Sequence, residues 1–330
     1  MISLNLLLEP RIGVRGPAAT LILLRSFTAV AIVCLVLAGG CARGPATGET
    51  SIKAKTLSEV EGSLRNNKAT LDEFRLRGPF ATTIHKDFEL RLSAKERIDS
   101  DLYLSAPAEK APLVIFLHGN DSSKDSHAFQ AMHLASWGMH ALALQLSNNG
   151  HWIENGKTLA RVVDLIRRAP EIIDTRIDVN KIILVGHSFG ASSVVIALAE
   201  GAPAAGGILL DPAVYGNDLP RSLRKVRTPL MVIGADEHVF TARNRDYFFH
   251  YIPRSVAEVS IKDASHEDAQ YPGDQAFGSE SNTTEELQIT FVSALTSAAF
   301  SLATTGALDY AWTTFDAVLK DGTFINAKKK

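Results

Sequence analysis

The sequence predicts a single α/β domain, built on a mainly parallel, doubly wound sheet with an antiparallel hairpin at its N-terminal edge. Two observations carry this prediction. Short apolar runs typical of buried strands alternate with longer segments of helical character from about residue 112 onward. Before them, two segments of alternating polarity flank a charged turn, which is typical of a hairpin. Strands separated by helices imply right-handed crossovers and a parallel sheet.

The elements follow from these patterns in chain order. The hairpin is expected at 88–92 and 101–104, and a short helix at 56–65. The expected strands beyond the hairpin are 112–117, 139–146, 181–185, 207–210, 230–233 and 256–261. The expected helices are 128–137, 157–168, 191–199 and 284–303, the last of them amphipathic and suited to cover one sheet face. We find no internal repeat and no second domain.

The N-terminus predicts export. An apolar stretch at 26–40 follows three arginines and, at fifteen residues, is shorter than the roughly twenty that span a bilayer. It ends in Leu37-Ala38-Gly39-Gly40-Cys41, which resembles the lipobox of bacterial lipoprotein precursors. The resemblance implies cleavage before Cys41 and attachment of diacylglycerol to its sulfur. Ala42 then favours the outer membrane if the cell is Gram-negative. An ordinary secretory signal, with Cys41 a bystander, stays as the alternative.

The predicted organisation is therefore a signal at 1–40, a lipidated tether and short segment at 41–79, and the α/β domain at 80–330. The chain has 330 residues, 46% of them hydrophobic, which is enough for one large core. Its formal net charge of −2 provides no basic footprint, so nucleic acid is not an expected partner. Lys328-Lys329-Lys330 is expected to be a frayed, solvated end.

The most informative motif is Gly186-His187-Ser188-Phe189-Gly190, between an apolar strand and a helix of small residues. A strand that runs straight into a helix through G-x-S-x-G makes a sharp turn with the serine at its apex. Side chains in place of the two glycines are expected to collide with the neighbouring strand and helix. The turn directs the helix amides toward charge that develops beside the serine. The motif therefore predicts that Ser188 is presented as a nucleophile.

Polar residues follow the ends of other predicted strands, where ligands bind in such sheets. His118-Gly119-Asn120 follows one strand, Asp236-Glu237 another, and Ser265-His266 the last. The chain order of serine, acid and histidine resembles that of the α/β-hydrolase family, over roughly residues 80–303. This resemblance implies a single α/β-hydrolase domain and a serine-dependent hydrolase.

Each residue has a chemical role in that interpretation. Ser188 is the nucleophile and needs a base to accept its proton. His266 is the candidate base, because imidazole changes charge near neutral pH. The acid that orients His266 is expected to be Asp236, with Glu237 as the alternative, since adjacent carboxylates point in different directions. The backbone amides of Phe189 and Asn120 are expected to hold the oxyanion.

Other polar residues near these strand ends have simpler explanations. His187 and His118 match family positions that support the turn, and neither is expected to transfer protons. His238 and Asp263 are expected to be solvated loop residues. Residues 148–152 lie where they can line the mouth of the site, although a plain turn is the favoured interpretation.

The segment between Asp211-Pro212 and Pro229 is too short for the helical cap that many family members insert. The uncapped site resembles the cutinase-like, dienelactone-hydrolase-like and acetylhydrolase-like branches, which implies hydrolysis of carboxylic esters through an acyl-enzyme, without metal or organic cofactor. The expected partners are an ester substrate and, through the anchor, a membrane; no protein partner is predicted. The alternatives are a peptidase, amidase or acyltransferase with the same triad, or a catalytically silent surface lipoprotein that binds a partner.

Overall fold

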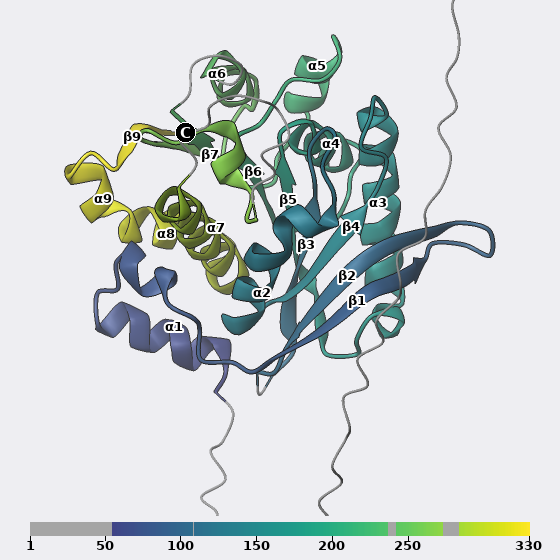
Figure 1. The fold of residues 1–330 in the computed structure, drawn as a ribbon, viewed down its shortest axis with the longest axis horizontal. Helices are drawn as coiled ribbons and strands as arrows, with labels where there is room; N and C mark the ends of the chain where they lie inside the picture. The colour runs from purple at the N-terminus through teal and green to yellow at the C-terminus, as the bar shows by residue number, and fades with distance from the viewer. Residues whose placement is uncertain (1–54, 108, 237–241, 273–283) are drawn as a thin grey trace, which may run out of the picture. The chain divides into compact units, whose positions relative to one another are not determined.

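The structure, a computed structural model, describes residues 55–107, 109–236, 242–272 and 284–330, which lie in a compact unit that spans Ile52–Lys330. In this part of the chain, one nine-stranded sheet has the order β1-β2-β4-β3-β5-β6-β7-β8-β9 (Figure 1). The strands are β1 Thr82–Arg91, β2 Arg97–Ser105, β3 Ala111–Leu117, β4 His140–Gln145, β5 Ile177–His187, β6 Gly206–Leu210, β7 Leu230–Ala235, β8 Val256–Ile261 and β9 Phe324–Lys329. Strands β3 to β8 pair in parallel, and β1, β2 and β9 pair antiparallel at the two edges. The predicted fold class is confirmed.

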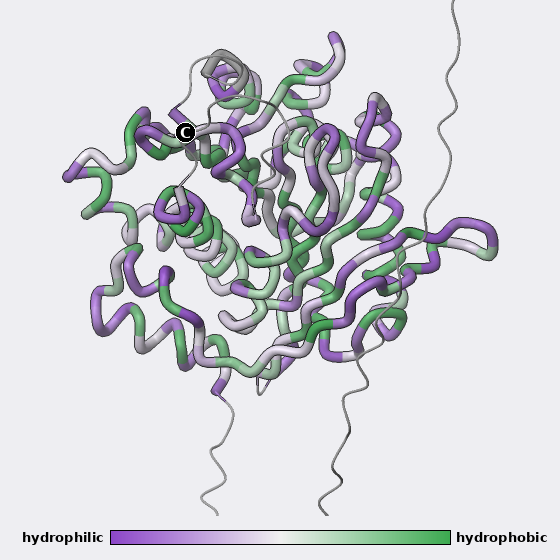
Figure 2. Tube along the Cα trace, viewed as in Figure 1, coloured by the Kyte–Doolittle hydropathy of each residue, from purple (hydrophilic) through white to green (hydrophobic). Residues whose placement is uncertain are grey.

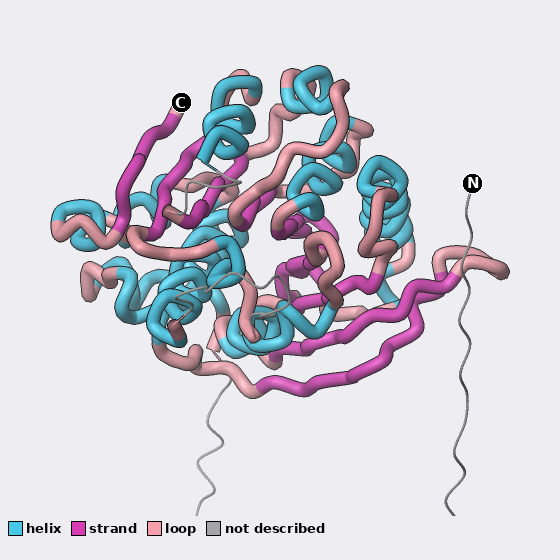
Figure 3. Tube along the Cα trace, turned by 45° about the horizontal axis from the view of Figure 1, so that its top comes forward, coloured by secondary structure: helices cyan, strands magenta, loops and turns pink. Residues whose placement is uncertain are grey.

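Helices cover both faces of the sheet (Figure 3). Their bounds are α1 Leu57–Asn66, α2 Ala128–Ser136, α3 Trp152–Arg168, α4 Phe189–Ala199, α5 Leu219–Leu223, α6 Ala242–Tyr251, α7 Glu285–Thr305, α8 Asp309–Thr314 and α9 Asp316–Lys320. Short 3₁₀ turns lie at Leu71–Arg75, Lys124–His127, Pro170–Ile172 and His266–Ala269. Helices α1, α2, α7 and α8 share one apolar cluster with the sheet. Helices α3, α4, α5 and α6 share the other, so the sheet is the middle layer of three.

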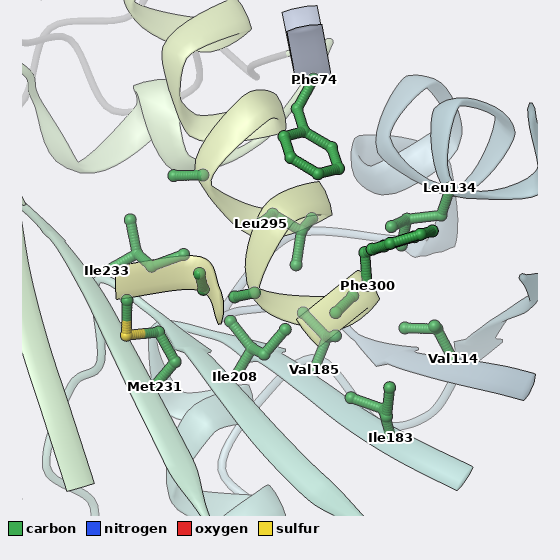
Figure 4. Close-up of a cluster of buried hydrophobic side chains, with 14 of the residues drawn as sticks. Phe74, Val114, Leu134, Ile183, Val185, Ile208, Met231, Ile233, Leu295 and Phe300 are labelled. Carbon is green, nitrogen blue, oxygen red and sulfur yellow. The ribbon is translucent and has the colours of Figure 1, made fainter. Parts of the chain in front are cut away.

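The central strands are apolar on both faces because helices bury both. Figure 2 shows this as green through the middle of the sheet, while the β1–β2 hairpin at the edge is more purple. Side chains of α7 lie directly over the strands (Figure 4), where the labelled members of the cluster are Phe74, Val114, Leu134, Ile183, Val185, Ile208, Met231, Ile233, Leu295 and Phe300. A parallel sheet covered on both sides requires such continuous apolar runs, which is why the sequence pattern predicted it.

Helix α7 differs from the expected amphipathic helix. From Thr290 to Ala303 every residue is buried, because α1, α8 and the turn at Leu71–Arg75 pack on the side that would otherwise face water. Among the described residues it is also the one helix long and apolar enough to cross a bilayer, and 83% of its apolar window is buried inside the fold. Burial in a protein core explains that composition.

The segment before β1 belongs to the same packed unit. Thr56 and Glu59 form a capping box at the start of α1, which satisfies the orphan amides of the first turn. Phe74, in the turn that follows, is fully buried, with its ring 4.7 Å from that of Trp137 and 5.8 Å from that of Phe300. The predicted helix at 56–65 is confirmed. The predicted signal peptide and Cys41 lie outside the described residues.

The connection between β6 and β7 contains only the short helix α5, and the described part of the chain holds no cap domain. The carboxyl end of the elbow strand β5 is therefore not covered by an inserted domain at this position. The turns that follow β3, β5, β6 and β8 all meet at this edge of the sheet, since the four strands are parallel. This edge is where the candidate site lies.

Candidate active site

Ser188 occupies a strained turn between β5 and α4. Its backbone has φ 53° and ψ −125°, a conformation that a residue other than glycine rarely adopts. Its amide donates to the Leu210 carbonyl of the neighbouring strand, and its carbonyl accepts from the Ala213 amide. These two hydrogen bonds on either side of Ser188 hold the turn in a backbone conformation that costs energy. Strain of this kind is typical of functional positions.

The two glycines of the motif have the expected steric role. A Cβ on Gly186 would lie 2.5 Å from the Gly190 carbonyl oxygen, where the helix begins. A Cβ on Gly190 would lie 2.4 Å from the carbonyl oxygen of His118, at the end of β3. Strand and helix therefore approach each other too closely for any other residue. This close approach keeps Ser188 at the apex of the turn.

His266 follows β8 and begins a 3₁₀ turn. Its Nδ1–H donates to Oδ2 of Asp211 at 2.5 Å, and Asp211 directly follows β6. A carboxylate on Nδ1 holds an imidazole in one tautomer and leaves Nε2 to accept a proton. The side chain of His266 is 24% exposed, whereas that of Asp211 is fully buried. The pair therefore has the geometry of a general base and the acid that orients it.

The sequence predicted Asp236 as the acid, but the carboxylate bonded to Nδ1 of His266 is that of Asp211. The Asp236 carboxylate instead accepts from the Asp263 amide at 3.2 Å, in the turn that leads to His266. Strand β7 lies between β6 and β8, so strand order alone does not select the acid; the hydrogen bond to Nδ1 of His266 does. The assignment of the acid is corrected accordingly. The alternative, Glu237, lies outside the described residues.

The sequence does contain a signal for Asp211. Asp211 stands immediately after an apolar strand, as Asp236 does, and the same rule about strand ends applies to both. In the sequence, Asp211-Pro212 was interpreted only as the start of the connection to Pro229. Applying the strand-end rule to β6 as well would have placed a third carboxylate among the candidates.

The surroundings of Asp211 favour its charged form. Burial alone would raise the pKa of this carboxyl group. The hydrogen bond from His266 and the charge of Arg245 lower the pKa by more than burial raises it, so the resulting pKa is below the ordinary value. The Arg245 guanidinium lies 3.4 Å from Oδ1 of Asp211, and the amide of Ala235 donates to the same oxygen at 2.9 Å. Asp211 is thus held as a fixed carboxylate beside the imidazole.

His187 connects the nucleophile turn to His266. It precedes Ser188 in the chain, and its ring lies 4.5 Å from the ring of His266. Its Nε2 lies 3.2 Å from the His266 carbonyl oxygen, close enough to donate a hydrogen bond. Burial, together with the charges of His266 and His127, holds the pKa of His187 well below its ordinary value, so this ring is neutral. It supports the turn, in agreement with the expectation.

The loop after β3 lies against Ser188. A Cβ built on Gly119 would be 2.9 Å from the Ser188 Cβ and 3.0 Å from Nδ1 of His187. The amides of Asn120, next in this loop, and of Phe189, at the start of α4, donate no hydrogen bond within the described residues. Free amides in the first turn of a helix are ready donors to an anion. Both amides stay candidate donors to an oxyanion at Ser188.

A side-chain network fixes the Gly119–Asn120 peptide. Nδ1 of the buried His118 lies 2.9 Å from the Gly119 carbonyl oxygen, and Nε2 lies 3.1 Å from the amide nitrogen of Gln145. Burial lowers the pKa of His118, so the ring is neutral and only one of its nitrogens carries a proton. Nε2 also lies 3.2 Å from the Leu146 carbonyl oxygen, but donation from the Gln145 amide to Nε2 requires the ring proton on Nδ1, which then donates to the carbonyl oxygen of Gly119.

Both the nitrogen and the oxygen of the Gln145 side-chain amide have hydrogen-bond partners. Its nitrogen also donates to the Leu146 carbonyl at 3.1 Å, and its oxygen accepts from the Lys124 amide at 3.0 Å. Because the Gly119–Asn120 peptide is planar and trans, a carbonyl held by His118 turns the Asn120 amide to the opposite side. Gln145 thus sets the orientation of a candidate oxyanion donor through His118.

Aromatic residues border the nucleophile on the α3 side. The ring of Phe189 lies 5.8 Å from that of Trp152 and 5.4 Å from that of Tyr215. Trp152 is fully buried at the first position of α3. The Tyr215 hydroxyl donates to the Gly150 carbonyl at 2.5 Å, and the Asn148 carbonyl accepts from the Asp121 amide at 2.9 Å. Residues 148–152 therefore form an ordered connection tied to the loop after β3.

The described residues contain no cluster of three or more histidine, cysteine, aspartate or glutamate side chains able to hold a metal ion. What the arrangement offers chemically is a hydroxyl on a strained turn, a paired imidazole and carboxylate, and two free amides. This combination fits nucleophilic attack on an acyl carbon.

A family model described as the alpha/beta hydrolase family matches residues 114–319, which is more than half of the 330 residues. The matched range includes Ser188, Asp211 and His266. No curated protein matches the chain.

Proposed function

The chain belongs to the alpha/beta hydrolase family, and on that premise we propose that it hydrolyses carboxylic esters through an acyl-enzyme formed on Ser188. The family is generally hydrolytic; the ester substrate and the individual roles are our proposal. The observation that supports it most is the hydrogen bond from His266 to Asp211, made at the sheet edge where the strained turn presents Ser188. This pair supports His266 as the general base, because a carboxylate on Nδ1 leaves Nε2 to accept a proton.

The proposed reaction has two halves. The Ser188 oxygen attacks the ester carbonyl carbon while Nε2 of His266 takes the hydroxyl proton. The carbonyl π electrons move to the oxygen, and the amides of Phe189 and Asn120 donate to the resulting oxyanion. The C–O bond to the alcohol then breaks as His266 returns the proton to that oxygen. An acyl group is left on Ser188.

Water completes the cycle by the same steps. His266 takes a proton from a water molecule whose oxygen attacks the acyl carbon, and it then returns that proton to the Ser188 oxygen as the acid departs. Asp211 stays ionised throughout and stabilises the imidazolium that forms twice in each turnover. No electron acceptor, metal or organic cofactor enters this scheme.

The experiment is a comparison of p-nitrophenyl esters with the matching p-nitroanilides, using the wild type and Ser188→Ala. We expect ester hydrolysis that Ser188→Ala abolishes and much slower turnover of the anilides. Faster turnover of the anilides would replace the proposal with an amidase. A folded wild type that cleaves neither series would favour a binding protein that has the fold without the chemistry.

We also propose that Cys41 carries the lipid anchor and that the protein is an envelope lipoprotein. The support is the sequence Leu37 to Cys41 after an apolar stretch of signal-peptide length. Expression with radiolabelled palmitate tests this directly, since the label should enter the wild type and not Cys41→Ser. Equal labelling of both would contradict it.

A further inference from the structure

Cations gather where the amino ends of β7 and β8 meet the C-terminus. In Figure 1, α5 and α6 lie next to each other at the top of the view, with the C-terminus and β9 beside α6. The cations come from three segments: the end of α5 and the residues after it, the loop between α6 and β8, and the end of β9. We call this surface the basic face; its residues are Arg224, Lys225, Arg227, Arg254, Lys328, Lys329 and Lys330.

The C-terminal lysines are ordered, and the expected frayed end is wrong. Strand β9 pairs antiparallel with β8, and Val256 and Lys330 exchange two backbone hydrogen bonds of 3.0 and 2.9 Å. Side chains alternate along a strand. Lys328 and Lys330 therefore both lie over the ring of Phe249, at 4.8 and 4.7 Å, whereas Lys329 lies over Trp312 at 5.3 Å.

Contacts around the last turn of α6 join the three segments. The Arg224 guanidinium lies 4.7 Å from the centre of the Tyr251 ring, and the Lys330 ammonium donates to the His250 carbonyl at 3.2 Å. Arg227 donates to the Arg224 carbonyl at 2.6 Å. Arg224, Lys328 and Lys330 are thus held around the end of α6 by its aromatic rings and the His250 carbonyl.

Most of this charge is not neutralised. Lys328 pairs with Asp246 and Glu258, and Lys329 with Asp309. Across the residues that the structure describes, the other five cations of the basic face make no ion pair, and all five are exposed. The whole chain has a formal charge of −2, so this positive charge is a local feature.

Two structural explanations account for part of the pattern. Lysines on an edge strand discourage pairing with another sheet, which fits Lys328 to Lys330. Cations near the end of α6 interact favourably with its dipole, which fits Arg224 and Lys330. Arg227 likewise donates to the carbonyl of Arg224 at the end of α5, so the two explanations leave Lys225 and Arg254 of the basic face unexplained. An anionic partner accounts for the complete set.

The basic face and the candidate site lie at opposite ends of the parallel strands. Ser188 and His266 follow the carboxyl ends of β5 and β8, whereas Arg254 and Lys330 lie at the amino ends of β7 and β8.

We propose that the basic face binds an anionic lipid surface and thereby turns the catalytic edge away from the membrane. Basic residues near a membrane are attracted by anionic headgroups within about one Debye length. The lipid anchor proposed at Cys41 would keep the domain at a membrane, which favours lipid over nucleic acid as the partner. The orientation rests on the proposed function, and it makes the substrate an ester that arrives from the aqueous side.

The test uses full-length protein with Cys41→Ser, so that no acyl chain provides attachment. Co-sedimentation is measured with vesicles of phosphatidylcholine alone and of phosphatidylcholine with phosphatidylglycerol. We expect binding only to the anionic vesicles, weakened by salt. The triple variant Arg224→Glu, Lys225→Glu, Lys330→Glu should bind at least about tenfold more weakly.

The matched control changes the same charge elsewhere, by Arg91→Glu, Lys95→Glu and Arg97→Glu at the exposed tip of the β1–β2 hairpin. It should retain binding. An equal loss in both triple variants, or binding to duplex DNA as tight as to the anionic vesicles, would overturn the proposal. Hydrolysis of a water-soluble ester should be unchanged in both variants, which separates this inference from the proposed chemistry.

Discussion

The carboxylate of Asp211 accepts a hydrogen bond from Nδ1 of His266 at 2.5 Å, across 55 residues of sequence. The two residues follow β6 and β8, and one strand separates these strands in the sheet. Parallel strands bring their carboxyl ends to one edge, so residues distant in sequence meet there. The account of catalysis rests on this pair together with Ser188.

The first prediction concerns the acid. Asp211→Asn should lower kcat by about 10⁴-fold, because an amide cannot hold the imidazole in the tautomer that accepts the serine proton. Asp236→Asn is the matched control. Its carboxylate accepts from the Asp263 amide, so we expect little change in kcat. Steady-state kinetics on one ester measure both, and a larger loss in Asp236→Asn would restore the acid expected from the sequence.

The sequence predicted the order of the strands and helices because a buried parallel strand needs continuous apolar residues and each crossover needs a helix. It also located Ser188 and His266 at strand ends. It did not identify Asp211, because Asp211 and Asp236 both follow parallel strands at the same edge, and which carboxylate reaches His266 depends on side-chain contacts that strand ends do not reveal. β9 was missed because Phe324 to Lys329 is short and ends in lysines, which have low strand propensity.

The second prediction concerns Gln145, which donates to Nε2 of His118. Gln145→Leu removes this donor, so His118 is free to carry its proton on Nε2 and to release the Gly119 carbonyl. We expect kcat to fall by about ten- to a hundredfold, less than the full loss of an oxyanion donor, with little change in KM.

Nitrogen NMR of His118 reports which ring nitrogen carries the proton, and a packing defect alone would not change that tautomer. The wild type should show the Nδ1–H tautomer and Gln145→Leu a shift toward the Nε2–H tautomer. Gln145→Glu, nearly the same in shape, presents only acceptors to Nε2 and should shift the tautomer further. An unchanged tautomer in both variants would exclude the proposed route from Gln145 to the oxyanion site.

The third prediction concerns stability in acid. Burial lowers the pKa of His140 from its ordinary 6.5 to about 4. Between these two pH values the unfolded chain binds a proton that the folded protein does not. The free energy of unfolding therefore falls as the pH drops from 6.5 to 4, by up to about 3 kcal/mol from this residue.

His140→Asn tests this contribution. Nδ1 of His140 accepts from the Ser105 amide at 3.0 Å, and the asparagine oxygen is able to accept the same bond without titrating. Denaturant unfolding between pH 7 and pH 4 should show a shallower loss of stability in the variant. His85→Asn, on the exposed strand β1, is the control. A slope equal to that of the wild type would show that His140 does not contribute.

The fourth prediction concerns the turn itself. Gly190→Ala places a Cβ 2.4 Å from the His118 carbonyl oxygen, a contact with backbone that no rotamer relieves. We expect a loss of about 3 kcal/mol or failure to fold. Gly62→Ala is the matched control, because a Cβ there meets nothing within 4 Å and the site is helical, where alanine stabilises by up to about 1 kcal/mol. Thermal unfolding distinguishes them; equal stabilities would contradict the packing described.

The most direct test of the central claim is labelling with a fluorophosphonate, which phosphonylates a serine only where a base activates it. We predict one adduct, located on Ser188 by peptide mass spectrometry, absent from Ser188→Ala and formed much more slowly in Asp211→Asn. A folded wild type that takes up no label, or an adduct on another residue, would contradict the account.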